Sequence, residues 1–141
     1  MKKILIIGAG AMGSAFSLPW IENNNRVTLI GTHIESKLIK NLKKNRYHPM
    51  LKSRLPNKLN ILDYKFLKSE LKKNYNYVVL AVSSKGIDWV IEKLVKNYVK
   101  KYYLIVLTKG LSIYKNKIIT ISNKIKLEFQ IKGLPIQLSL I

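Results

Sequence analysis

The sequence has 141 residues, a length that suits one domain with a single core. Hydrophobic residues make up 48% of it, too many for a disordered chain despite a formal net charge of +19, and the lack of cysteine excludes a disulfide framework or a thiolate metal site. No apolar run reaches the roughly 18 residues of a membrane span, and the N-terminal apolar stretch is too short for a signal peptide. We therefore expect a soluble, cytoplasmic protein.

The positive charge is almost entirely lysine and is spread along the whole chain. Strongly basic proteins often bind nucleic acid or anionic membranes. Here only three of the 26 basic residues are arginine, and Lys, Asn, Ile and Tyr, which all have A/T-rich codons, fill 62 of the 141 positions. Genome composition therefore explains much of the charge, and we expect neither nucleic acid nor membrane as a partner. The charge would still attract phosphorylated ligands.

Apolar runs alternate with helical patterns from the first residues to the last. The run from Lys2 to Ile7 is typical of a strand buried on both faces of a parallel sheet. Further strands are predicted at residues 26–30, 60–62, 77–82 and 103–107, and an apolar run closes the sequence at 135–141. Helices are predicted at residues 11–24, 35–45, 66–71, 87–98 and 118–129, with a polar, proline-marked loop at 47–58.

This alternation predicts βαβ units with right-handed crossovers. We therefore predict an α/β fold of Rossmann type, with a mostly parallel sheet of about six strands and helices on both faces. Residues 1–141 form one dinucleotide-binding domain in this interpretation.

A glycine-rich turn follows the first strand and opens the first helix. Gly8, Gly10 and Gly13 match the G-x-G-x-x-G pattern. In that pattern the first glycine allows a tight turn, the second lets the backbone approach a pyrophosphate, and the third lets the helix pack closely on the strand. The free N–H groups and the positive dipole of the helix start then hold the phosphates. The motif predicts a site for a dinucleotide, although a tight turn that binds nothing has the same pattern.

The end of the second predicted strand bears on the choice between NAD and NADP. The fingerprint places an acid there, which holds the ribose hydroxyls. This sequence has Gly31, Thr32 and His33 instead, and a missing carboxylate favours NADP over NAD because no charge repels the 2′-phosphate. Thr32 and His33 are candidate donors to that phosphate. Thr32 and Glu35 also fit a T-x-x-E capping box for the next helix.

With these residues placed, the chain resembles the amino-terminal domain of NAD(P)-dependent glycerol-3-phosphate dehydrogenases. The resemblance extends over essentially the whole chain, and the block around Lys109 is its most particular part. A loop from Asn45 to Pro49 also resembles that family, in a variant that carries His-Pro. The blocks are Ile7 to Ala15, Val27 to Gly31, Ala81 to Ser84 and Thr108 to Leu111.

The resemblance implies reduction of dihydroxyacetone phosphate to sn-glycerol 3-phosphate, a precursor of phospholipids. It implies that Lys109, just beyond a strand, contacts both substrate and cofactor as a catalytic and binding residue. Val82 and Ser83 would lie against the cofactor. The family often has proline at the position of Ser83, and the serine in this sequence loosens the turn.

The resemblance also implies cofactor contacts in the glycine-rich turn and the His-Pro loop. Ala11 and Met12 occupy the positions where the family's turn touches the cofactor, and packing of the helix is the alternative for Met12. Tyr47 and His48 are weaker candidates for the cofactor cleft, because a histidine in a loop usually lies at the surface.

The family's second, helical substrate domain has no counterpart in this sequence. We therefore expect a fragment that binds dinucleotide and turns over little or no substrate. The oligomeric state stays open, with a homodimer as one alternative. Two other functions also remain: a dehydrogenase of the ketopantoate reductase type, and a non-catalytic basic module that binds a cofactor or nucleic acid.

Overall fold

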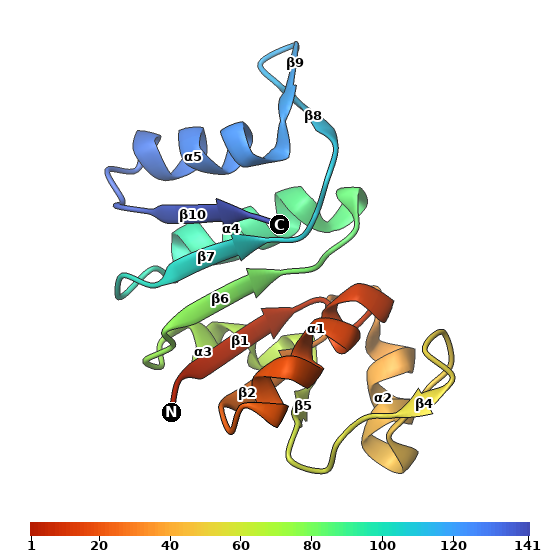
Figure 1. Ribbon diagram of the computed structural model, residues 1–141. Helices are drawn as coiled ribbons and strands as arrows, with labels where there is room; N and C mark the ends of the chain where they lie inside the picture. The colour runs from red at the N-terminus through yellow and green to blue at the C-terminus, as the bar shows by residue number, and fades with distance from the viewer.

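A six-stranded parallel sheet forms the centre of the molecule in the computed structural model, which describes all residues from 1 to 141 (Figure 1). The strands follow the order β10-β7-β6-β1-β2-β5, and every pair in the sheet is parallel. The predicted α/β fold is therefore confirmed. The strands are β1 (Lys3–Ile7), β2 (Arg26–Ile30), β5 (Asn60–Leu62), β6 (Tyr77–Leu80), β7 (Tyr103–Val106) and β10 (Gln137–Leu140).

Helices cover both faces of this sheet. Two of them, α1 and α2, pack on one face, whereas α3, α4 and α5 pack on the other. The helices are α1 (Ala11–Glu22), α2 (Ser36–Asn45), α3 (Leu67–Leu71), α4 (Ile87–Lys96) and α5 (Ile121–Ile131), with 3₁₀ turns η1 (Tyr64–Phe66) and η2 (Ser84–Gly86). No helix is both long and apolar enough to cross a membrane.

The central strand β1 explains why there are two cores. Side chains alternate across a strand, so Ile4 and Ile6 join the cluster under α1 and α2, while Leu5 and Ile7 join the cluster under α3, α4 and α5. All four are fully buried. An unbroken apolar run is therefore required at this position, as the sequence predicted.

Two small antiparallel hairpins were not predicted. The loop at 47–58 contains β3 (Tyr47–His48) paired with β4 (Ser53–Arg54). The predicted helix at 118–129 is wrong in its first turn, because β8 (Leu111–Tyr114) and β9 (Lys117–Thr120) form a hairpin there. Its two-residue turn has positive φ at both residues, 47° at Lys115 and 62° at Asn116, which is the geometry that suits the twist of paired strands. Helix α5 then begins after its N-cap Thr120, whose hydroxyl accepts the Asn123 N–H at 3.2 Å.

Candidate functional site

The carboxyl ends of the parallel strands meet at one edge of the sheet. From β1 the chain moves outward to β2 and β5 in one direction, and β6, β7 and β10 continue in the other. Open α/β sheets bind ligands in the crevice where the strand order reverses in this way. The strand order reverses between β1 and β6, and the turn after β1 lies at the carboxyl end of β1, at this point of the sheet (Figure 1).

Two glycines in this turn have no room for a side chain. Gly8 has φ +110°, and a Cβ atom placed on it would lie 2.4 Å from the carbonyl oxygen of Ala81, just beyond β6. A Cβ on Gly13 would lie 2.0 Å from the carbonyl oxygen of Gly8. The first glycine thus lets the turn contact β6, and the third lets α1 sit directly on the turn. Both are geometric roles that the motif predicts.

The start of α1 offers free hydrogen-bond donors. Gly10 is the N-cap and provides no side-chain cap, and the first backbone bond of the helix runs from the Ser14 N–H to the Gly10 carbonyl. The N–H groups of Ala11 and Met12 therefore have no partner within the chain. A Cβ on Gly10 would meet only a Glu35 oxygen, at 3.7 Å, so the space beside it is open. This arrangement fits a phosphate or pyrophosphate group.

Side chains from three other positions hold the backbone of Ala9, which is fully buried. Glu35 Oε2 accepts the Ala9 N–H at 3.0 Å, and Ser14 Oγ donates to the Ala9 carbonyl at 2.9 Å. His48 Nε2 lies 3.0 Å from the same carbonyl, while its Nδ1 accepts the Leu51 N–H at 3.3 Å. Because Nδ1 is an acceptor, we assign the proton to Nε2, which donates to Ala9.

These contacts correct the sequence interpretation of His48. We expected a histidine in this loop to lie at the surface, but its side chain is fully buried. It lies behind the glycine-rich turn, whereas Tyr47 next to it is 44% exposed. The antiparallel pairing of His48 with Ser53 turns the ring inward, and no local sequence pattern signalled that hairpin.

The region after β2 differs from expectation in two ways. Thr32 does not complete the predicted capping box, because its hydroxyl is buried without a partner and the Glu35 N–H donates to the Thr32 carbonyl at 3.0 Å. Of the two reciprocal hydrogen bonds of a capping box, only the one from the glutamate side chain forms: Glu35 Oε2 accepts the Thr32 N–H at 2.7 Å. A carboxylate therefore does lie beside the glycine-rich turn. It comes from Glu35, five residues beyond the end of β2, rather than from the end of the strand itself.

Aromatic rings gather beside His33, which is exposed. Its ring centroid lies 5.0 Å from that of Trp89 in the first turn of α4, and the Tyr64 ring is 6.5 Å from Trp89. All three residues follow strand ends at the carboxyl edge, and sequence analysis identified only His33. Flat apolar rings at such an edge offer a surface on which a planar base can stack.

The remaining predicted residues follow β6 and β7 along the same edge. The Thr108 hydroxyl donates to the Val82 carbonyl at 2.7 Å, which joins the two loops. Lys109 is exposed, and none of the three ion pairs in the chain includes it. With Thr108, Gly110 and Ser122, among others, Lys109 lines a cavity of about 310 Å³. An unpaired ammonium at this edge can compensate a phosphate or an oxyanion.

The turn at Ser83 keeps a backbone that proline would also adopt. Its φ is −67°, close to the value that a proline ring imposes, and its N–H has no partner within the chain. We expect Ser83→Pro to raise the free energy of unfolding by about 0.4–1 kcal/mol, because proline restricts the unfolded chain. Urea denaturation followed by circular dichroism measures this. A lower stability in the variant would show that the turn does need its present flexibility.

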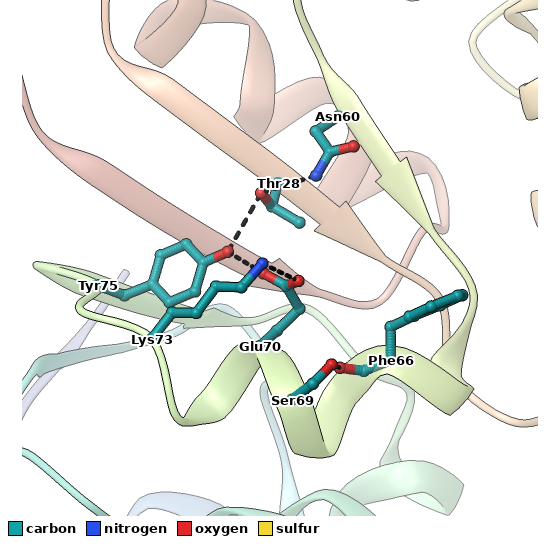
Figure 2. Close-up of polar contacts among 7 residues, drawn as sticks. All are labelled: Thr28, Asn60, Phe66, Ser69, Glu70, Lys73 and Tyr75. Carbon is teal, nitrogen blue, oxygen red and sulfur yellow. Dashed lines mark hydrogen bonds and ion pairs between the residues drawn. The ribbon is translucent and has the colours of Figure 1, made fainter.

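A second polar cluster lies away from this edge (Figure 2). Tyr75, which precedes β6, donates its hydroxyl to Glu70 of α3 and also lies 3.2 Å from the Thr28 hydroxyl. Lys73 Nζ is 2.6 Å from Glu70 Oε1, and Asn60 Nδ2 donates to Thr28 at 3.3 Å. Burial, followed by the hydrogen bond to Glu70, raises the pKa of Tyr75 above its usual range. These contacts tie α3 to β2 and β5.

Comparison with known proteins identifies similar chains. The family model described as NAD-dependent glycerol-3-phosphate dehydrogenase N-terminus matches residues 3–137. The NADP(+)-dependent glycerol-3-phosphate dehydrogenase of Archaeoglobus fulgidus is 36% identical over 121 residues, which are 84% of this chain and 34% of that protein. The glycerol-3-phosphate dehydrogenase [NAD(P)+] of Wigglesworthia glossinidia brevipalpis is 35% identical over 111 residues, 77% of this chain and 32% of that protein.

A solved structure shares the fold at lower sequence identity. Glycerol-3-phosphate dehydrogenase from Coxiella burnetii superimposes with a TM-score of 0.77 at 19% identity, covering 99% of this chain and 40% of that one. The chain thus spans about a third of the length of the curated relatives that it matches.

Proposed function

Because this chain belongs to the family of NAD-dependent glycerol-3-phosphate dehydrogenase amino-terminal domains, we propose that it binds NAD or NADP at the glycine-rich turn and serves the reduction of dihydroxyacetone phosphate to sn-glycerol 3-phosphate. The observation that carries the proposal is the pair of free N–H groups at Ala11 and Met12, in a turn held in place by Glu35 and His48. The family match disfavours a ketopantoate reductase and a non-catalytic basic module.

In this proposal each loop at the carboxyl edge has a distinct task. The N–H groups of Ala11 and Met12 donate to the pyrophosphate, and the dipole of α1 adds to the attraction. Val82 and Ser83 lie along the dinucleotide, and Thr32 and His33 lie near its adenosine ribose. When bound, the nicotinamide supplies the hydride that reduces the ketone carbon. Lys109 contacts the dinucleotide, and it also offsets the negative charge of the substrate phosphate or of the developing alkoxide.

The proposal also states what residues 1–141 contribute to the reaction by themselves. Residues 1–141 supply the dinucleotide-binding part, so we expect them alone to bind dinucleotide and to turn over little or no dihydroxyacetone phosphate. NADPH oxidation by the purified chain measures that turnover. We place the reaction in the cytoplasm, because phosphorylated substrate and dinucleotide carry charges that oppose passage through a bilayer.

A homodimer is part of the proposal as well. Ile113 and Ile118 on the β8–β9 hairpin are 68% and 73% exposed and would be covered by a second copy. Sedimentation equilibrium at several concentrations tests this state, and a monomer throughout would contradict it.

Titration of the purified chain with NADH and NADPH, followed by calorimetry, tests the proposal. We expect both to bind, and we expect Lys109→Met to weaken binding about tenfold, the loss of one charge-assisted contact. Lys101→Met is the matched control, since Lys101 is exposed at the opposite end of β7 and loses the same charge. If neither dinucleotide binds, the proposed function is wrong. If the two variants bind equally well, the role of Lys109 is wrong.

A further inference from the structure

In a Rossmann site the adenosine ribose lies between the glycine-rich turn and the end of the second strand. Glu35 contacts both of these segments. Its Oε2 accepts the Ala9 N–H of the glycine-rich turn at 3.0 Å and the Thr32 N–H at the end of β2 at 2.7 Å. One oxygen thereby fixes the distance between these two segments. The side chain reaches back from the residue just before α2, where the chain has already left the strand.

The second oxygen of Glu35 is not used within the chain. Oε1 has no hydrogen-bond or ion-pair partner, and it lies 3.7 Å from the position that a Cβ on Gly10 would occupy. Gly10 is the residue whose open side lets a dinucleotide approach the backbone. A carboxylate oxygen at this place can accept a hydrogen bond from a ribose hydroxyl and repels a phosphate group.

Thr32 adds an independent observation at the same place. It is only 3% exposed, and its hydroxyl has no hydrogen-bond partner. Buried polar groups normally have partners, so an orphaned hydroxyl beside a held carboxylate indicates a position that a ligand or water completes.

We propose that Glu35 is the ribose-reading acid of this site, supplied from the start of α2 instead of from the end of β2. Its Oε2 holds the glycine-rich turn against β2, and its Oε1 accepts a hydroxyl of the adenosine ribose. Glu35 therefore sets the relative affinity for NADH and NADPH, whose difference is a phosphate on that ribose. This inference rests on the proposed dinucleotide binding and names the residue that discriminates between its two ligands.

The test is the ratio of the NADH and NADPH dissociation constants in wild type, Glu35→Gln and Glu22→Gln. Gln keeps an oxygen that can accept both N–H groups but removes the charge, so we expect the ratio to shift toward NADPH by about tenfold, or about 1.4 kcal/mol. Glu22 is exposed at the last residue of α1, and its variant loses the same charge without a change in the ratio.

Several outcomes separate this inference from the proposed function. Failure of wild type to bind either dinucleotide would contradict the proposed function. If both dinucleotides bind and the ratio of their dissociation constants is the same in Glu35→Gln and Glu22→Gln, the role of Glu35 alone is overturned. An equal loss of affinity for NADH and NADPH in Glu35→Gln would also overturn it, since a merely structural contact weakens the binding of both ligands together. Glu35→Asp, which keeps the charge, should retain a ratio close to that of wild type. If Glu35→Gln does not fold, wild type alone still tests the role of Glu35: it should bind adenosine 5′-monophosphate more tightly than adenosine 2′-monophosphate, and the reverse order would overturn that role.

Discussion

Replacement of Gly8 by alanine is expected to lower the free energy of unfolding by more than about 3 kcal/mol, a large part of the 5–15 kcal/mol typical of a domain. Two causes add at this position. The backbone has φ +110°, which a residue with a Cβ adopts only under strain, and that Cβ would lie 2.4 Å from the carbonyl oxygen of Ala81. Because the oxygen belongs to the backbone next to β6, it moves only if the sheet moves. Urea denaturation of the purified variant measures the loss.

Two other glycines separate these causes. Gly110 has a similar φ of +117° with no atom within 4 Å of the added Cβ, so Gly110→Ala should show the conformational cost alone, about 1–3 kcal/mol. Gly13 lies in α1 with ordinary helical φ, but its Cβ would lie 2.0 Å from the Gly8 carbonyl oxygen, so Gly13→Ala should show the steric cost. Equal losses in Gly8→Ala and Gly110→Ala would mean that the close approach to β6 contributes nothing.

Stability is also expected to fall as the pH rises above about 10, the ordinary pKa of tyrosine. The folded state raises the pKa of Tyr75, first by burial and then through its hydrogen bond to Glu70. Above pH 10 the unfolded chain loses this proton while the folded chain keeps it, so the folded state binds more protons and the free energy of unfolding decreases with pH. The stabilisation is fully present below pH 10. Urea denaturation at pH 8, 9, 10 and 11 measures the slope.

Tyr102 provides the matched comparison for Tyr75. Burial raises its pKa too, but its hydroxyl has no hydrogen-bond partner. Both Tyr75→Phe and Tyr102→Phe should therefore reduce the alkaline slope, and because each is compared with wild type, the titration of lysines cancels. At pH 8 the two should differ: Tyr75→Phe removes a donor from the buried Glu70 carboxylate and should cost about 1–3 kcal/mol, whereas Tyr102→Phe should cost little. An unchanged alkaline slope in Tyr75→Phe would contradict this account.

Local patterns were sufficient to predict the parts of the fold that depend on local chemistry. Strands β2 and β5 fall at the residues predicted. Strand β1 lies within its predicted run, because a strand buried on both faces requires consecutive apolar side chains. The roles of Gly8 and Gly13 were also predictable from the local pattern, because a tight turn and a close helix contact leave no room for a Cβ at these positions. The cofactor roles of Ala11, Met12, Val82, Ser83 and Lys109 remain predictions.

The errors concern contacts between segments that are distant in sequence. His48 contacts Ala9 across 39 residues, and Glu35 contacts it across 26, so neither contact has a local signature. The β8–β9 hairpin was missed for another reason. Its turn uses Lys115 and Asn116 in the left-handed region instead of the glycine that usually marks such turns, and the apolar residues of β9 run directly into α5.

The contact between Gly8 and Ala81 sets an order of events during synthesis. The turn after β1 leaves the ribosome early, but the backbone against which it closes belongs to a segment more than 70 residues later. Strand β1 also remains unpaired on one side until β6 is available. Strand β1 must therefore wait, with apolar side chains uncovered, until the segment that contains β6 has been translated. The site that looks most local in the sequence is completed only when the chain has been made as far as Ala81.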